Sequence, residues 1–166
     1  LWLEMLPLIA KVKEYYIMRD DKTAIIQDLS RRIVQKLVLG ETSVELRQKI
    51  VSYICSNLKR SLCPFPNEQC NIGFAACYNH TETLYFAEEL EQINRDITQN
   101  FACKIYKSIG ENEKYLKLRK YLLFSCDDYC DYAIFLWENG EKYRAINVAE
   151  EGIERGTESK MNIYEF

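Results

Sequence analysis

The chain has 166 residues, of which 48% are hydrophobic and 28% charged, and it contains only three prolines and six glycines. This composition is typical of a soluble globular protein and excludes collagen-like and disordered classes. A formal net charge of -3 gives no general attraction to phosphate, so binding to nucleic acid or to a membrane surface would need a local basic patch. Its apolar stretches are far shorter than the roughly 20 residues that span a bilayer.

Cysteine usage points to a reducing environment. The seven cysteines are an odd number and lie within helical patterns instead of short, loop-rich spacings. We therefore expect free thiols and a cytoplasmic protein. Because the chain begins at Leu1 without an initiator methionine, we also expect it to be part of a longer protein.

The first 62 residues predict three helices, because apolar side chains recur there at steps of three and four. The first helix is expected to run to about Met18. The second covers about residues 25–37, with Gly40 just past its end in the position that favours glycine. The third is expected to start at the capping box of residues 42–45, with Thr42 as the cap.

A proline-containing loop is expected next, at residues 63–73, because Pro64 and Pro66 forbid a continuing helix. It would separate an N-terminal portion, residues 1–62, from helical hairpins in residues 74–166, within one continuous domain. The stretch from Phe74 onward favours one helix or two, with an interruption at residues 79–81.

Two segments of the C-terminal half repeat each other at an offset of 30 positions. Residues 101–115 align with residues 131–145, and in both an apolar helical pattern stops at a glycine, Gly110 or Gly140, and resumes after a charged turn. Such helix pairs bury their apolar faces by stacking. No segment shows sustained period-two alternation, so we expect an all-α fold of seven or eight helices, arranged as antiparallel hairpins in a short α-solenoid.

The second hairpin resembles a tetratricopeptide repeat. Small or apolar residues occupy that family's positions at Ala133, Leu136, Gly140, Ala145, Ala149 and Gly152. The small ones would let the two helices approach closely. The first copy keeps Tyr106 and Gly110 but carries Tyr115 and Arg119 where the family prefers small residues.

The resemblance implies a non-catalytic module for protein–protein interaction, with an inner surface that holds an extended or helical partner segment. Its lining would be Asn100, Lys104 and Lys107 in the first hairpin and Cys130, Ile134 and Trp137 in the second. An asparagine with two lysines suits the carboxylate of a peptide, so the implied protein or peptide partner includes acidic ones. Trp137 suits an apolar anchor beside it. The competing interpretation, which we favour for the tryptophan itself, places Trp137 in the core.

Residues 104–120, 131–133 and 145–153 also resemble the helical region that follows the finger in bacterial SWIM zinc-finger proteins. That family's Cys-x-Cys and Cys-x-His pairs are missing here. The resemblance implies an alternative function, a regulatory helical domain of a bacterial parent that contributes to nucleic-acid binding. Its phosphate contacts would come from Lys104, Lys107, Lys114, Lys117, Arg119 and Lys120. The simpler explanation of this segment is that helices expose lysines.

Metal binding has weak candidates. Cys63, Cys70, Cys77 and His80 carry ligand atoms, but only the last two have the close spacing of structural zinc sites, so we expect no metal and no cofactor. Cys126 and Cys130 lie one helical turn apart, and we expect both to pack in the core.

Catalysis has little basis in the sequence. The single histidine, His80, has no local signature that pairs it with a cysteine, and the glycines form no phosphate-binding loop. Asp127, Asp128 and Asp131 could hold a cation, but they lie where a helix begins and are expected to cap it. We therefore do not expect an enzyme.

Overall fold

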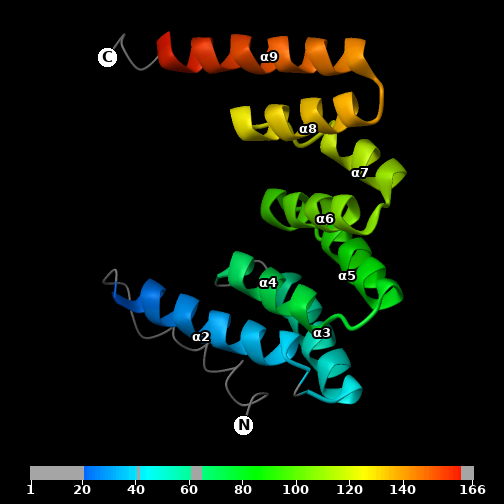
Figure 1. Cartoon of the computed structure of the whole chain (residues 1–166). Helices are drawn as coiled ribbons and strands as arrows, with labels where there is room; N and C mark the ends of the chain where they lie inside the picture. Colours follow the sequence, from blue (N-terminus) through cyan, green and yellow to red (C-terminus); the bar gives the residue numbers. More distant parts are fainter. Residues whose placement is uncertain (1–20, 41, 61–64, 162–166) are drawn as a thin grey trace. The chain divides into compact units, whose positions relative to one another are not determined.

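The computed structural model describes residues 21–40, 42–60 and 65–161 (Figure 1). Within these ranges the chain forms eight helices and no strand, which confirms the all-α class. The helices are α2 (Asp21–Val38), α3 (Val44–Leu58), α4 (Pro66–Ala76), α5 (His80–Gln92), α6 (Asp96–Ile109), α7 (Asn112–Arg119), α8 (Cys126–Glu138) and α9 (Lys142–Met161). In the same ranges, no helix combines the length and apolar character needed to cross a bilayer.

The chain divides into two compact units, Leu1–Glu111 and Asn112–Phe166. Helices α2 to α6 belong to the first unit and α7 to α9 to the second. The division falls just after Gly110, inside the first predicted hairpin, and not in the proline-containing segment at residues 63–73.

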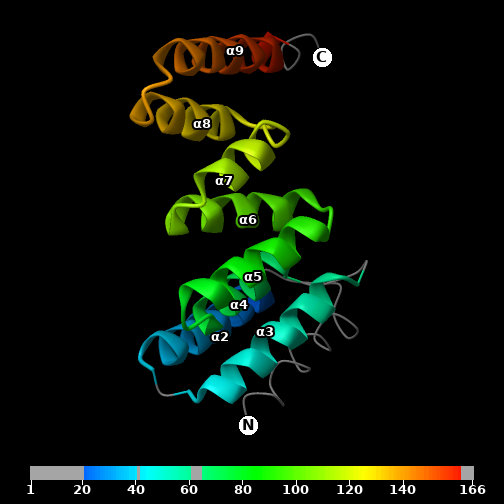
Figure 2. The same cartoon turned by 90° about the vertical axis from the view of Figure 1, so that its right-hand side faces the viewer.

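In the first unit, α4 packs against α2 and α3, and α5 packs against α6 (Figure 2). The core is built from apolar residues of all five helices, including Ile26, Ile54, Ile72, Phe86 and Ile105. Close packing requires Gly73 on α4, because a Cβ atom there would lie 2.3 Å from Phe86 Cζ.

Arg47 ties three helices of this unit together and is itself buried. Its guanidinium donates to three main-chain carbonyl oxygens, those of Leu37, Thr42 and Ala75. Leu37 and Ala75 lie in the last turns of α2 and α4, where carbonyl groups lack helical partners and carry partial negative charge. The arginine therefore serves as a shared C-terminal cap.

Several predicted boundaries hold. Helix α2 matches the second predicted helix, and Gly40 follows it with φ +76°. The break expected at residues 79–81 is present but begins two residues earlier, because residues 77–79 separate α4 from α5. Asn79 is the N-cap of α5 and accepts a hydrogen bond from the Glu82 amide. The helix expected up to Met18 lies outside the described residues.

Two local predictions were wrong. Ser43, not Thr42, caps α3, and its hydroxyl accepts a hydrogen bond from the Leu46 amide. The loop expected at residues 63–73 is helical from Pro66 onward. The reason is that a proline in the first turn of a helix loses no intrahelical hydrogen bond, so Pro66 starts α4 where we expected it to break a helix.

The 30-residue repeat is present in the local geometry. Gly110 and Gly140 both adopt left-handed conformations, with φ +78° and +84°. The glycine amide bonds to the carbonyl three residues back, and the next amide bonds to the carbonyl five residues back, at both places. This is the Schellman motif. Helices α6 and α8 begin 30 residues apart, and so do α7 and α9.

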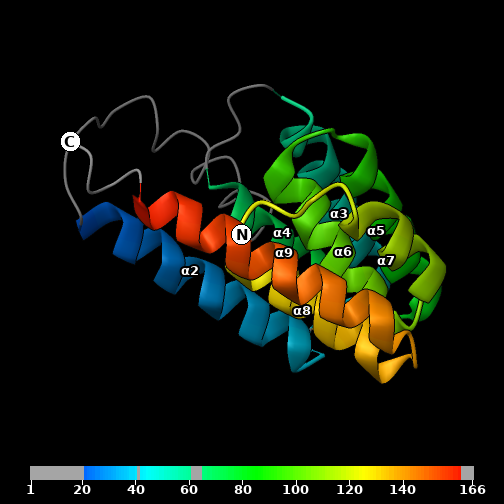
Figure 3. The same cartoon turned by 90° about the horizontal axis from the view of Figure 1, so that it is seen from above.

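The second unit packs α7 and α9 against α8. The Tyr115 and Phe135 rings lie 4.3 Å apart between centroids. Buried Arg119 on α7 reaches both Asp128 (2.9 Å) and Asp131 (2.7 Å) on α8. Helix α9 runs back along α8, as Figures 1 and 3 show.

Arg119 is a buried side chain with two ion pairs, and its removal should destabilise the second unit. We expect Arg119→Met to lower the free energy of unfolding by about 2–3 kcal/mol, because it leaves two partly buried carboxylates without their partner. The control is Arg155→Met, which removes an exposed pair with Glu151 and should cost less than about 1 kcal/mol. Chemical denaturation followed by tryptophan fluorescence measures both. Equal stability of the two variants would contradict this role.

Candidate functional site

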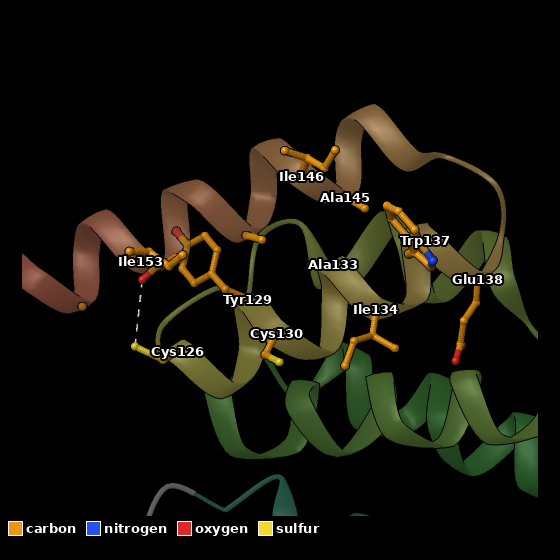
Figure 4. Close-up of a pocket in the computed structure, with 13 residues that line it drawn as sticks. Cys126, Tyr129, Cys130, Ala133, Ile134, Trp137, Glu138, Ala145, Ile146 and Ile153 are labelled. Atoms are coloured by element: carbon orange, nitrogen blue, oxygen red, sulfur yellow. Dashed lines mark hydrogen bonds between the residues drawn. The ribbon is translucent and has the colours of Figure 1, made fainter.

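An open apolar groove of about 740 Å³ runs between α8 and α9 (Figure 4). It is lined by Cys126, Tyr129, Cys130, Ala133, Ile134, Trp137 and Glu138 from α8, and by Ala145, Ile146, Ala149, Gly152, Ile153 and Gly156 from α9. Large apolar side chains are left exposed there, with Trp137 52% and Ile153 68% exposed. A contiguous apolar surface of this kind is typical of a docking site.

The groove exists because α9 contributes small residues to the contact. Gly152 faces Tyr129 so closely that a Cβ atom at Gly152 would lie 2.6 Å from the tyrosine Cβ. Ala145 is buried in the same contact. Small side chains on α9 let the helices approach, as the tetratricopeptide-like pattern predicts for Gly152 and Ala145, and leave room beside the larger residues of α8.

Two aromatic side chains of the groove are held in place by polar neighbours. The Tyr129 hydroxyl donates to Glu151 Oε1 at 3.0 Å, and burial together with this carboxylate raises the pKa of Tyr129, so the hydroxyl stays a donor. Arg155 lies over the same ring, 5.5 Å from its centroid. The Lys142 ammonium lies 5.3 Å from the Trp137 ring centroid in a cation–π contact.

Both cysteines of α8 are exposed in the groove, so the prediction that they pack in the core was wrong. Helix α8 buries the face that carries Tyr132, Phe135 and Leu136, and the stripe with Cys126 and Cys130 points the other way. The Cys126 thiol donates to the Gly152 carbonyl oxygen at 3.9 Å, which the dashed line in Figure 4 marks. Trp137 is likewise not in the core.

The predicted partner-binding residues fall on two different units. Asn100, Lys104 and Lys107 lie on one face of α6 in the first unit, where Lys104 is exposed and the other two are half-buried. Ile134 and Trp137 lie on α8 in the second unit and line the groove. A single inner surface formed by all five stays a prediction.

The acidic cluster is involved in capping and in ion pairing. Ser125 and Asp128 form a reciprocal capping box at the start of α8, which confirms the predicted capping role for Asp128. Asp131 instead pairs with Arg119 and accepts a hydrogen bond from Tyr115. Because Arg119 is buried in this network, it does not belong to an exposed basic patch, contrary to its predicted phosphate contact.

The three metal candidates among the described residues, Cys70, Cys77 and His80, do not form a cluster. Cys70 is fully buried in α4, and Cys77 donates to the Gly73 carbonyl oxygen at 3.3 Å. Burial raises the pKa of Cys77 to about 12, which keeps the thiol protonated. His80 is exposed and lies 3.5 Å from Glu111. Cys63 lies outside the described residues, and within them no three potential ligands come together.

A second cavity, of about 960 Å³, lies in the first unit between α2, α3 and α4. Its lining is more polar and includes Ser30, Arg31, Arg47 and Asn71. Arg47 already donates to three carbonyl oxygens, which accounts for its presence there without a ligand. The α8–α9 groove is therefore the better candidate for a functional site.

No family model, no curated protein and no solved structure matches the chain. The site is therefore interpreted from its own geometry.

Sequence reasoning missed the α9 side of the groove as an exposed surface. Ile146 and Ile153 belong to the helical pattern of the second hairpin, yet they are 46% and 68% exposed. A signal was present, because the small residues Ala145 and Gly152 already occupy the stripe that meets α8, where both are buried. The isoleucines beside that stripe had no assigned partner.

Gly152 should be the residue on which the groove depends most. We expect Gly152→Ala to destabilise the second unit by about 1–2 kcal/mol, because a clash with Tyr129 Cβ outweighs the helix propensity gained. Gly156→Ala is the matched control, since its nearest neighbour is the Cys126 sulfur at 3.0 Å, which can rotate away. Denaturant unfolding compares the two. A Gly152→Ala variant as stable as the control would show that the helices are not held this closely.

Proposed function

We propose that this chain is a non-catalytic module that binds an apolar helical segment of a partner protein in the α8–α9 groove. The observation that carries the proposal is the exposure of Ile134, Trp137, Ile146 and Ile153 around one groove. Exposed tryptophan beside aliphatic residues is typical of an interface anchor. Burial of these side chains by a partner would supply the main driving force.

The shape of the groove favours a helix as the occupant. Two antiparallel helices leave a furrow between them, and a third helix can pack its own side-chain ridge into such a furrow. The α8 part of the lining, from Cys126 to Glu138, spans about 18 Å at the rise of an α-helix. An amphipathic segment of about 12 residues would therefore cover it.

The repeat geometry supports a wider proposal, that the chain belongs to a tetratricopeptide-like solenoid. The matched glycine turns at Gly110 and Gly140 place equivalent helices at a fixed interval of 30 residues. The six free cysteines among the described residues support a reducing, cytoplasmic location. The kinship with bacterial SWIM zinc-finger proteins rests on the sequence pattern alone.

The nucleic-acid alternative loses one of its six predicted contacts, because Arg119 is buried and ion-paired. An acidic partner held by Lys104 and Lys107 concerns α6 in the first unit and stays a separate prediction. Salt separates these alternatives from the groove: phosphate-driven binding weakens steeply with ionic strength, whereas apolar docking responds weakly.

The test is a comparison of affinities for a partner captured from cell extract and then purified. Trp137→Ala should weaken binding at least tenfold, because it removes the central anchor. The matched control is Tyr121→Ala, which removes an aromatic residue that is 69% exposed and outside the groove lining, and it should change affinity less than twofold. Titration by biolayer interferometry measures both.

A third variant decides between the two surfaces. Lys104→Glu/Lys107→Glu reverses the charge on α6 and should leave binding to the groove unchanged. If this variant abolishes binding while Trp137→Ala does not, the partner docks on α6 and the proposed groove is wrong.

A further inference from the structure

Three carboxylates stand at the edge of the groove. Asp127 and Glu138 lie on α8, one seven residues before Ile134 and the other four residues after it, so they share its edge of the helix. Glu150 lies on α9 between Ile146 and Ile153, four residues after the first and three before the second. Each exposed isoleucine of the groove therefore has an acidic neighbour on its own helix.

No basic side chain of the described residues neutralises these carboxylates. Asp127, Glu138 and Glu150 are exposed and make no ion pair with any residue that the structure describes. By contrast, Arg144 pairs with Glu141, the residue that precedes α9, and Arg155 pairs with Glu151 on the same helix. Arg119 is engaged with Asp128 and Asp131.

One cation lies at the same site. Lys142 is at the turn end of the groove with its ammonium over the Trp137 ring. Even when it is counted, the three carboxylates leave the rim with an excess of negative charge. A partner that buried its apolar stripe here would bring its flanking side chains close to this rim.

We propose that the occupant of the groove is a basic amphipathic helix of another protein, with an apolar stripe for the groove and lysine or arginine beside it; this rests on the function proposed above. The apolar contact supplies affinity, and the acidic rim selects the sign of the flanking charge. A second copy of this chain is a poor occupant, because two copies that met groove to groove would bring the same carboxylates together.

The test uses two synthetic peptides of about 18 residues with the same leucine stripe. One carries lysine at every polar position and the other carries glutamate. Both are titrated into the full chain by fluorescence anisotropy at fixed ionic strength. We expect the lysine peptide to bind at least tenfold more tightly, and Trp137→Ala to weaken it.

The rim is then neutralised with Asp127→Asn/Glu138→Gln/Glu150→Gln. This triple variant should bind the lysine peptide about fivefold to tenfold more weakly, because it loses three exposed ion pairs with the peptide lysines. The matched control, Glu45→Gln/Asp96→Asn/Glu113→Gln, changes the net charge equally at exposed sites outside the groove and should bind within twofold of wild type. Circular dichroism confirms that both variants fold.

The outcomes separate the inference from the function beneath it. Equal binding of both peptides, still dependent on Trp137, keeps the docking function and overturns the basic partner. Equal weakening by the rim variant and its control shows a general attraction to an acidic protein and also overturns it. Absence of binding by either peptide overturns the docking function and the inference together. Self-association in sedimentation that Trp137→Ala abolishes would identify a second copy as the occupant instead.

Discussion

The close contact between Gly152 and Tyr129 is the constraint on which the functional surface depends. A helix pair with ordinary side chains at both positions would stand farther apart, and the exposed isoleucines of α8 and α9 would not line one groove. The missing side chain at Gly152 lets Tyr129 lie against α9. The tyrosine hydroxyl then donates to Glu151 on α9. The contact that brings α8 and α9 close together therefore also fixes the position of Tyr129 in the lining of the groove.

The rest of the second unit holds α8 from its other side. Arg119 joins α7 to two carboxylates of α8, and the Tyr115 ring contacts the Phe135 ring at a tilt of 49°. Because these contacts bury one face of α8, its opposite stripe is left to form the groove. The same helix thus supplies core on one side and binding surface on the other, with no residue of the groove needed for catalysis in this account.

The sequence was sufficient for the elements that local physics determines. Periodicity located α2, and the left-handed turns at Gly110 and Gly140 followed from a glycine placed between two helical patterns. It was insufficient wherever the outcome depended on what lies opposite a residue. Pro66 can end or begin a helix, and only the fold decides which. The helical pattern places Cys130 and Trp137 on an apolar face, but it does not tell whether that face is buried in the core or exposed in a groove. Arg119 is taken for a surface charge until its two carboxylate partners are known.

The location of a bound helix is the most direct test of this account. In an amide and indole correlation spectrum of the isotope-labelled chain, Trp2 and Trp137 give the two indole signals, and Trp137→Phe assigns them. Addition of the lysine–leucine peptide should shift the Trp137 indole signal together with amides along the groove faces of α8 and α9. Shifts confined to α6, around Lys104 and Lys107, with an unchanged Trp137 signal, would contradict the central claim that the α8–α9 groove is the binding site.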